Sequence, residues 1–310
     1  MAIIKTLKNK KDAQVRWQIR KQLPALAGSI MQTAAIFPHE PHATTYTQPT
    51  YRRDDFLYPE LSALPVPPQE FWASYCTSVA SFLRSGEEDI AEIRRLLVES
   101  GAPIEQAGSI LEIGVAGGRL IRWLEDLAPT TEIWGVDLWG SAIQWCRDCL
   151  CPPFQVATTT FVPTVPFEDR SFGLIYAGSV WTHIDDLADA WLLECRRLLR
   201  PGGRLFITIN DRAAVRMFEG EGDPALYPRF YERTGGQANW DQFVAMLRAN
   251  ESYARFKSGD VKMVTFGRSI AAHVLWDADY LCDRVKRYLR VRSITPAAYG
   301  HQTGIVFERI

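Results

Sequence analysis

The stretch that decides the fold is Ile110-Leu111-Glu112-Ile113-Gly114-Val115-Ala116-Gly117-Gly118-Arg119-Leu120. It has the pattern of an apolar strand with an acid near its end, a glycine-rich turn, and a helix that starts at about Gly118. Glycines in such a turn let the backbone approach a ligand where any side chain would block it. The turn therefore predicts a ligand site at the end of this strand.

A carboxylate follows at the distance that nucleoside-binding folds use. Trp134-Gly135-Val136-Asp137 ends the next predicted strand, roughly twenty residues beyond the glycine turn, where an acid accepts hydrogen bonds from ribose hydroxyls. Together, the turn and Asp137 predict a cofactor that carries a nucleoside.

The spacing of the glycines separates two classes of cofactor. A dinucleotide fingerprint that starts at Gly114 needs glycine at positions 116 and 119 to seat a pyrophosphate on the helix N-terminus, but the chain has Ala116 and Arg119 there. S-adenosylmethionine has no pyrophosphate, and its ammonium group needs an anionic partner, which Glu112 supplies in this interpretation. The pattern therefore favours S-adenosylmethionine.

Segments of strand length and of helix length alternate around the turn. Strands are predicted at 109–113, 132–136, 154–157, 173–176, 204–209, 289–294 and 304–308, and helices at 71–83, 88–99 and from about 118, 141 and 186. The turn between the last two strands, around 296–300, is too short for a crossover helix, so these strands should be antiparallel. The order predicts an α/β fold with a seven-stranded, mostly parallel sheet, an antiparallel last strand and helices on both faces.

The remaining segments are assigned to additions around this core. Residues 1–69 are predicted to hold a basic helix over Lys5–Lys21 and a proline-rich arm that packs on the main domain. Residues 70–310 form the predicted catalytic domain, with a helical insertion at about 212–276. The arm and the insertion are expected to form the lid of the acceptor pocket.

Composition excludes several classes of protein. The 310 residues carry a formal net charge of -1, which gives no bulk attraction to nucleic acid or membrane. The chain has neither a run of apolar residues long enough to span a bilayer nor a secretory signal, so a cytoplasmic protein is predicted. Cys146, Cys149 and Cys151 lack a second cysteine pair for structural zinc and are expected to be buried or half-buried thiols, with no metal site. A homodimer stays open.

These motifs resemble the class I, Rossmann-like S-adenosylmethionine-dependent methyltransferases over about residues 64–310. The segments that carry the resemblance are the glycine turn 112–119, the acid-bearing 135–138, the approach to strand four at 165–172, its exit at 178–184, and the turn into strand five at 198–205. Five segments in the right order are more specific than one. The sequence departs from the family pattern at Ala116, where a glycine is usual, and at Gly173, where an aspartate is common.

The resemblance also implies a set of site residues and a class of acceptor. The residues implied to bind the cofactor are Glu112, Gly114, Ala116, Gly118, Asp137, Leu138, Thr159 and Gly178, and those implied to line the acceptor pocket are Trp181, Asn210 and His273. The lead-in Leu64-Pro65-Val66-Pro67-Pro68 resembles a bacterial subgroup that modifies natural products and sugars. A small-molecule or glycan acceptor is therefore expected, methylated at oxygen or nitrogen.

His183 is the candidate for a proton acceptor, because it follows strand four and imidazole titrates near neutrality. In the alternative interpretation His183 only packs in the loop before a helix whose N-terminal acids are Asp185 and Asp186. His273 and His301, in the C-terminal region, are weaker candidates to face the acceptor.

Three alternative functions remain open at this point. A relative that binds the cofactor with little or no activity is suggested by Ala116, and a nicotinamide-dependent oxidoreductase fits the fold class but lacks the required glycines. A nucleic-acid partner that binds the basic N-terminus is the third. Nucleic-acid bases are disfavoured as methyl acceptors, because Ala177-Gly178-Ser179-Val180-Trp181 lacks the Asn/Asp-Pro-Pro-aromatic stretch of enzymes that methylate DNA amino groups.

Overall fold

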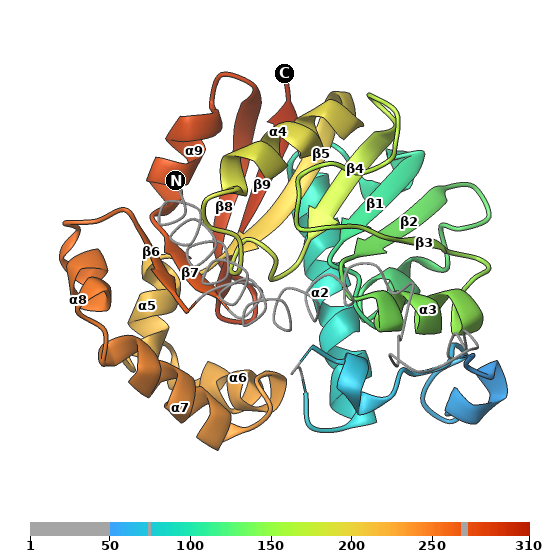
Figure 1. The fold of residues 1–310 in the computed structure, drawn as a ribbon, viewed down its shortest axis with the longest axis horizontal. Coiled ribbons are helices and arrows are strands. Elements are labelled where there is room, and N and C mark those ends of the chain that lie inside the picture. The colour runs from blue at the N-terminus through green and yellow to red at the C-terminus, as the bar shows by residue number, and fades with distance from the viewer. Residues whose placement is uncertain (1–49, 74–75, 268–271) are drawn as a thin grey trace, which may run out of the picture.

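A seven-stranded sheet forms the centre of the molecule (Figure 1). The computed structural model describes residues 50–73, 76–267 and 272–310. The strands are β1 (Ser109–Ile113), β2 (Glu132–Asp137), β3 (Gln155–Thr158), β4 (Phe172–Ala177), β5 (Leu199–Ile209), β8 (Leu289–Tyr299) and β9 (Gln302–Arg309). Their order is β3-β2-β1-β4-β5-β9-β8, in which β1 to β5 pair in parallel and β9 is antiparallel to both of its neighbours. The predicted fold class is confirmed.

Helices cover both faces of this sheet, because successive side chains of a strand point to opposite faces. Ile110 and Leu174 belong to one hydrophobic cluster, and their chain neighbours Leu111 and Ile175 belong to another. The first cluster includes residues of α2 (Val79–Glu99) and α3 (Gly140–Cys149), and the second includes residues of α4 (Ala188–Leu198) and α9 (Ala278–Val285).

The strand order fixes where a ligand can enter. From β1 the chain places β2 and β3 on one side and β4 and β5 on the other. Ligands of open parallel sheets bind outside the carboxyl ends of the strands at such a reversal of strand order. The glycine turn after β1 and the loop after β4 both lie at this point.

The insertion forms a lobe with its own hydrophobic core, centred on Phe218, Trp240 and Phe256. It contains α5 (Arg212–Phe218), α6 (Tyr227–Arg233), α7 (Gln237–Arg248), α8 (Glu251–Ser258) and the antiparallel pair β6 (Met263–Phe266) and β7 (His273–Trp276). The lobe lies beside the β8–β9 end of the sheet (Figure 1). The predicted helical insertion did not include this strand pair, whose four-residue strands are too short for a clear periodic pattern.

The two helices predicted at 71–83 and 88–99 are in fact one short turn and one long helix. Residues Gln69–Phe71 form a single 3-10 turn, and α2 runs without a break from Val79 to Glu99. Ser78 caps α2, because its side chain accepts the N–H of Ser81. Gly86, which falls between the two predicted helices, lies inside α2. A Cβ at this position would overlap the carbonyl oxygen of Arg119 and come within 2.8 Å of Trp123 Nε1.

We expect Gly86→Ala to destabilise the protein, although alanine has a higher helix propensity than glycine. Alanine in place of glycine stabilises an open helix position by about 1 kcal/mol, but overpacking a filled site costs about 1–3 kcal/mol. Gly86→Ala is therefore expected to lower the free energy of unfolding, measured by urea denaturation. The matched control is Ala91→Gly at an exposed position of the same helix, which should cost about 1 kcal/mol. A Gly86→Ala variant more stable than the parent would contradict the close approach.

The helix predicted from about Gly118 does not form. Gly118 has φ +76°, and only a 3-10 turn at Ile121–Leu124 follows it. The Arg122 guanidinium is buried here and donates to the carbonyls of Leu64 and Pro65. The segment is therefore buried against the arm, and the strand-turn-helix pattern on which the prediction rested contains no information about that contact.

The described part of the proline-rich arm packs against the main domain, as predicted. The rings of Tyr51 and Phe56 join the cluster that contains α2 and α3, and Phe56 contacts Trp145 edge to face with ring centroids 5.8 Å apart. The predicted basic helix at Lys5–Lys21 lies outside the described residues.

Two smaller expectations concern the start of α4 and the burial of the cysteines. Helix α4 begins at Ala188, so Asp185 and Asp186 precede it and are not its N-terminal acids. Cys146 and Cys149 are buried and Cys151 is partly buried, all as free thiols, as expected. Among residues 50–73, 76–267 and 272–310, no helix combines the length and apolarity needed to cross a bilayer.

Candidate cofactor and acceptor site

The glycine turn is a strained loop held by one carboxylate. Gly114, Ala116 and Gly118 all have positive φ, of +83°, +42° and +76°. Glycine adopts such angles freely, whereas alanine pays a steric cost. The Ala116 N–H donates to Asp137 Oδ2 at 2.7 Å. This hydrogen bond helps to hold Ala116 in a conformation that glycine adopts more readily.

Asp137 sits where the turn, β2 and β3 meet. Its Oδ1 accepts the N–H of Trp139 at 2.8 Å, and its backbone oxygen accepts the N–H of Thr159 at 2.8 Å. Burial raises the pKa of the Asp137 carboxyl, and hydrogen bonds from the backbone of Trp139, Ala116 and Leu138 oppose that rise. A carboxylate has about four lone-pair sites. Asp137 can therefore hold the turn and still accept hydrogen bonds from a ligand.

Thr159 supplies a polar atom without a partner beside this carboxylate. Its Oγ1 is buried and, within the described residues, makes no hydrogen bond. Buried polar atoms are rarely left unsatisfied in a complete assembly. The position of Thr159 at the end of β3, next to Asp137, fits a group that binds a nucleoside.

Glu112 lies beneath the turn in β1 and is almost fully buried. Its Oε2 accepts the phenol hydroxyl of Tyr176 at 2.9 Å. Burial raises the pKa of Glu112 to about 8 although the bond from Tyr176 opposes the rise, so the carboxyl is mostly neutral at pH 7. A cation placed beside it lowers that pKa, so an approaching ammonium group would favour the ionised form.

Gly114 and Gly178 serve close packing between the two strand ends. A Cβ on Gly114 would lie 2.5 Å from Val180 Cγ2, and one on Gly178 would lie 2.5 Å from the Tyr299 hydroxyl. The loops after β1 and β4 are therefore in direct contact. In this conformation the space beside the two glycines is filled by the side chains of Val180 and Tyr299, so neither glycine provides space for a ligand.

His183 has a defined tautomer. Its Nδ1 lies 2.6 Å from the backbone oxygen of Ala272, which can only accept, so Nδ1 carries the proton and Nε2 has the lone pair. Burial lowers the pKa of His183, although the bond to Ala272 opposes this, and the imidazole is neutral at pH 7. The structure thus gives His183 the protonation state that a general base needs.

The loop that bears His183 is also joined to β7 of the insertion. The Val274 N–H donates to the Thr182 carbonyl at 2.8 Å, and Trp276 Nε1 donates to the Trp181 carbonyl at 3.1 Å. The ring of Trp181 is completely buried in the hydrophobic cluster that contains α4 and α9. This placement corrects the assignment of Trp181 to the acceptor pocket, because its ring supports the loop from within the core.

His183, His273 and His301 come together beside aromatic rings of the insertion. The ring centroids of His183 and His273 are 5.3 Å apart, and that of His273 is 4.9 Å from Phe243. His301 lies 5.2 Å from Trp240. Burial lowers the pKa of His273 to about 4 and that of His301 to about 3, with smaller contributions from His183, Arg233 and His273 as neighbours. These rings form a partly buried wall of neutral imidazoles and aromatic side chains, here named the aromatic wall.

Asn210 ends β5 next to this region and is buried. Its carbonyl accepts the N–H of Trp276 at 2.9 Å, and its Oδ1 has no hydrogen-bond partner in the described part of the chain. Like Thr159 Oγ1, Asn210 Oδ1 is therefore a buried polar atom without a hydrogen-bond partner in the described residues at the carboxyl end of a strand. The two atoms mark the same edge of the sheet.

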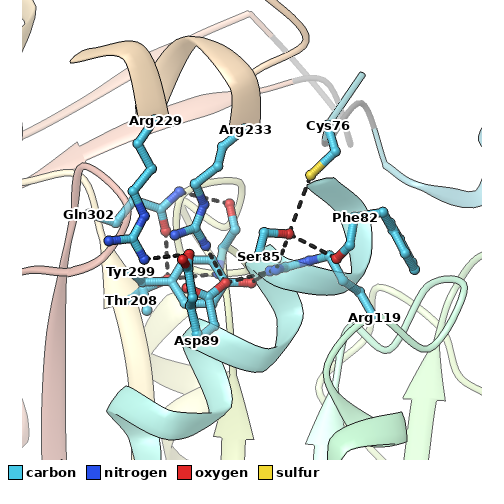
Figure 2. A network of polar contacts seen from close by, with 12 residues as sticks. Cys76, Phe82, Ser85, Asp89, Arg119, Thr208, Arg229, Arg233, Tyr299 and Gln302 are labelled. Carbon is cyan, nitrogen blue, oxygen red and sulfur yellow. Dashed lines mark hydrogen bonds and ion pairs between the residues drawn. The ribbon is translucent and has the colours of Figure 1, made fainter. Parts of the chain in front are cut away.

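Sequence reasoning missed a buried polar network behind the glycine turn. The Asp89 carboxylate on α2 binds both Arg119 of the turn, at 2.8 Å, and Arg233 of α6 (Figure 2). Arg119 also donates to the Tyr299 hydroxyl. Exposed ion pairs between Arg84 and Glu232 and between Glu88 and Arg229, both at 2.5 Å, flank this network. Asp89 and Arg233 are 144 residues apart, so no local pattern could pair them.

Possible metal ligands are the His, Cys, Asp and Glu side chains. Within the described ranges, no group of three or more His, Cys, Asp or Glu side chains is arranged to hold one. The three histidines of the site contact carbon rings and a backbone carbonyl.

Comparison with known proteins agrees with this geometry. A family model described as a methyltransferase domain matches residues 111–207. The malonyl-[acyl-carrier protein] O-methyltransferase of Hahella chejuensis is 24% identical over 134 residues, which are 43% of this chain and 46% of that protein. The match therefore spans less than half the length of the curated relative.

A solved structure supports the fold assignment independently. The PH0226 protein from Pyrococcus horikoshii OT3 aligns with a TM-score of 0.50 and 16% identity, over 79% of this chain and 100% of that one. Residues 111–207, which match the methyltransferase domain, contain the glycine turn, Asp137 and the loop after β4, so this match agrees with the resemblance to class I S-adenosylmethionine-dependent methyltransferases that the sequence motifs indicate.

Proposed function

We propose that this protein transfers a methyl group from S-adenosylmethionine to an oxygen or nitrogen atom of a small-molecule acceptor, with His183 as the proton acceptor. The observation that carries the proposal is the Asp137 carboxylate, which binds the Ala116 N–H of the glycine turn at 2.7 Å and lies within the segment matched by the methyltransferase model.

The residues around Asp137 fit an adenosyl group. In the proposal Asp137 accepts a ribose hydroxyl, Thr159 Oγ1 binds the nucleoside through its unused hydrogen-bonding capacity, and Leu138 lies beside it. Glu112, below the turn, would ionise toward the ammonium of the methionine part. When bound, S-adenosylmethionine supplies an electrophilic methyl group.

His183 performs the proton transfer in this proposal. Its Nε2 lone pair takes the proton of an acceptor hydroxyl or amine, while Nδ1 stays bonded to the Ala272 carbonyl and keeps the ring in place. The aromatic wall holds the acceptor through contact with His273 and Phe243 and excludes water from the site. Neutral imidazoles and carbon rings favour an acceptor that presents an apolar or planar surface to them.

Calorimetry with the purified protein tests the cofactor part of this proposal. We expect saturable binding of S-adenosylhomocysteine and no binding of NAD or NADP at the same concentrations, because the turn lacks the glycines that a pyrophosphate needs. Tight binding of a dinucleotide without binding of S-adenosylhomocysteine would favour an oxidoreductase. Incubation of small-molecule extracts with cofactor labelled in its methyl group tests the transfer. Binding without any labelled product would favour a protein that only binds the cofactor.

A further inference from the structure

We infer that Thr208 and Gln302 are positioning residues, which hold the His183 loop through a closed ring of hydrogen bonds to Ser179. This inference rests on the proposed function in that it takes His183 as the proton acceptor. Thr208 lies on β5 and Gln302 on β9, and they lie at one end of the polar network in Figure 2. Neither residue stands out in the sequence, because their strands carry no recognisable motif there.

Ser179 is the strained residue that the ring holds. It directly follows Gly178 at the exit of β4, and its φ is +58°. A non-glycine residue in this left-handed region is disfavoured and persists only where its surroundings fix it. Such residues cluster at functional sites. Ser179 lies four positions before His183 and directly precedes the tight turn 180–183, which the His183 N–H closes by donating to the Val180 carbonyl at 2.9 Å.

The hydrogen bonds of the ring can be assigned one direction only. The Ser179 N–H donates to Thr208 Oγ1 at 2.6 Å, so the Thr208 hydroxyl must donate onward to Gln302 Oε1, also at 2.6 Å. Gln302 Nε2 then donates to Ser179 Oγ at 2.9 Å. The Thr182 hydroxyl donates to the Ser179 carbonyl at 3.0 Å, which leaves the Ser179 hydroxyl to donate to Thr182 Oγ1 at 3.2 Å. Every hydroxyl proton has one acceptor.

Burial makes this ring rigid. Thr208, Gln302 and Thr182 are 0%, 5% and 1% exposed, so water cannot replace a lost partner without a local rearrangement. Hydrogen bonds of buried groups are costly to leave unmade. A displacement of the loop by 1 Å is enough to lower a rate about a hundredfold when geometry controls catalysis. The ring therefore fixes where Nε2 of His183 points.

Thr303 offers a matched control next to Gln302. It is also completely buried, on the same strand, and within the described residues its hydroxyl makes no hydrogen bond. Thr→Val removes a hydroxyl and keeps the shape. Thr208→Val therefore breaks the ring, Thr303→Val removes a hydroxyl without breaking any described bond, and Thr208→Ser keeps the hydroxyl in the ring.

The first measurement is an NMR titration of the His183 imidazole, assigned by comparison with His183→Asn. Its midpoint in the parent protein lies below the usual 6.5 because the ring is buried; among the described residues His273 is its titratable neighbour. Thr208→Val is expected to raise the midpoint by about half a pH unit or more, because a loosened loop lets water reach the ring. Thr208→Ser and Thr303→Val should keep the parent midpoint.

The second measurement separates positioning from cofactor binding. Thr208→Val should lower the rate of labelled methyl transfer at least about tenfold, while the Kd for S-adenosylhomocysteine stays within about twofold, and Thr208→Ser should restore the rate. If Thr208→Val does not fold, Ser179→Ala gives the same test, because it removes the hydroxyl that Gln302 and Thr182 bind.

An unchanged midpoint and rate in Thr208→Val would overturn the inference. If the parent protein transfers no methyl group, the proposed function fails, but the titration still shows whether the ring holds the loop. The two failures are therefore distinguishable.

Discussion

Asp137→Ala is expected to weaken the binding of S-adenosylhomocysteine by about 10- to 100-fold. In the proposed site this carboxylate accepts a ribose hydroxyl, and a hydrogen bond to a charged group contributes about 1.5–3 kcal/mol. Its loss corresponds to about one to two powers of ten in Kd. The substitution also removes the bond that holds Ala116 at positive φ, so the turn itself loosens. Titration calorimetry measures the change.

Glu132→Gln is the control for Asp137→Ala. Glu132 is exposed at the other end of β2 and carries the same charge, so its replacement changes net charge but not the site. Its Kd should stay at the parent value. Equal affinities for the parent and Asp137→Ala, with both proteins folded, would remove Asp137 from the nucleoside site.

His183→Ala is expected to lower the turnover number by about 10²–10⁴-fold, the usual contribution of a general base, with S-adenosylhomocysteine affinity unchanged. Thr303 supplies the control as Thr303→Val, because it lies outside the aromatic wall and its buried hydroxyl makes no hydrogen bond within the described residues. Its variant should retain most of the activity. A His183→Ala enzyme with parental turnover would show that the acceptor loses its proton without this residue.

The pH dependence of kcat/KM gives a second sign of the same role. The neutral imidazole is the active form, and burial places the pKa of His183 below its usual 6.5. Activity should therefore be constant above about pH 6.5 and fall as the pH drops through the lowered pKa. In His183→Ala this acidic decline should disappear from the residual activity.

The same shifts set the sign of the dependence of stability on pH. His183, His273 and His301 all have a lower pKa in the folded protein, so the unfolded chain binds more protons at acidic pH. The stabilising contribution of these neutral rings is complete above about pH 6.5 and is lost progressively below it. Circular dichroism at each pH separates this loss of fold from the catalytic decline.

Local patterns in the sequence were sufficient for the strands and the glycine turn. The bounds of β1 at Ser109–Ile113 were predicted without error, and the ends of β2 and β4 within one residue. These strands lie next to each other in a parallel sheet and carry nearly continuous apolar runs. The position of Asp137 follows from the strand end, so the contact between Asp137 and the turn could be expected from the chain alone.

Features that depend on distant residues could not be predicted in this way. The two predicted helices left a gap that contains Gly86, and the Arg119 carbonyl that explains glycine at this position belongs to another segment. The tautomer of His183 depends on Ala272, 89 residues further along the chain. The pairing of Asp89 with Arg119 and Arg233 likewise depends on tertiary structure. The local periodicity of apolar residues contains no information about such contacts.

The backbone contacts between β7 and the His183 loop separate recognition from chemistry. The carbonyls of Thr182 and Ala272 and the N–H of Val274 belong to the main chain, so they are present whatever side chains the insertion carries. Replacement of aromatic side chains on α5 or α7 can thus reshape the surface that meets an acceptor while the His183 ring keeps its position. A lineage built on this scaffold can change its acceptor repertoire through the lobe and leave the reacting centre untouched.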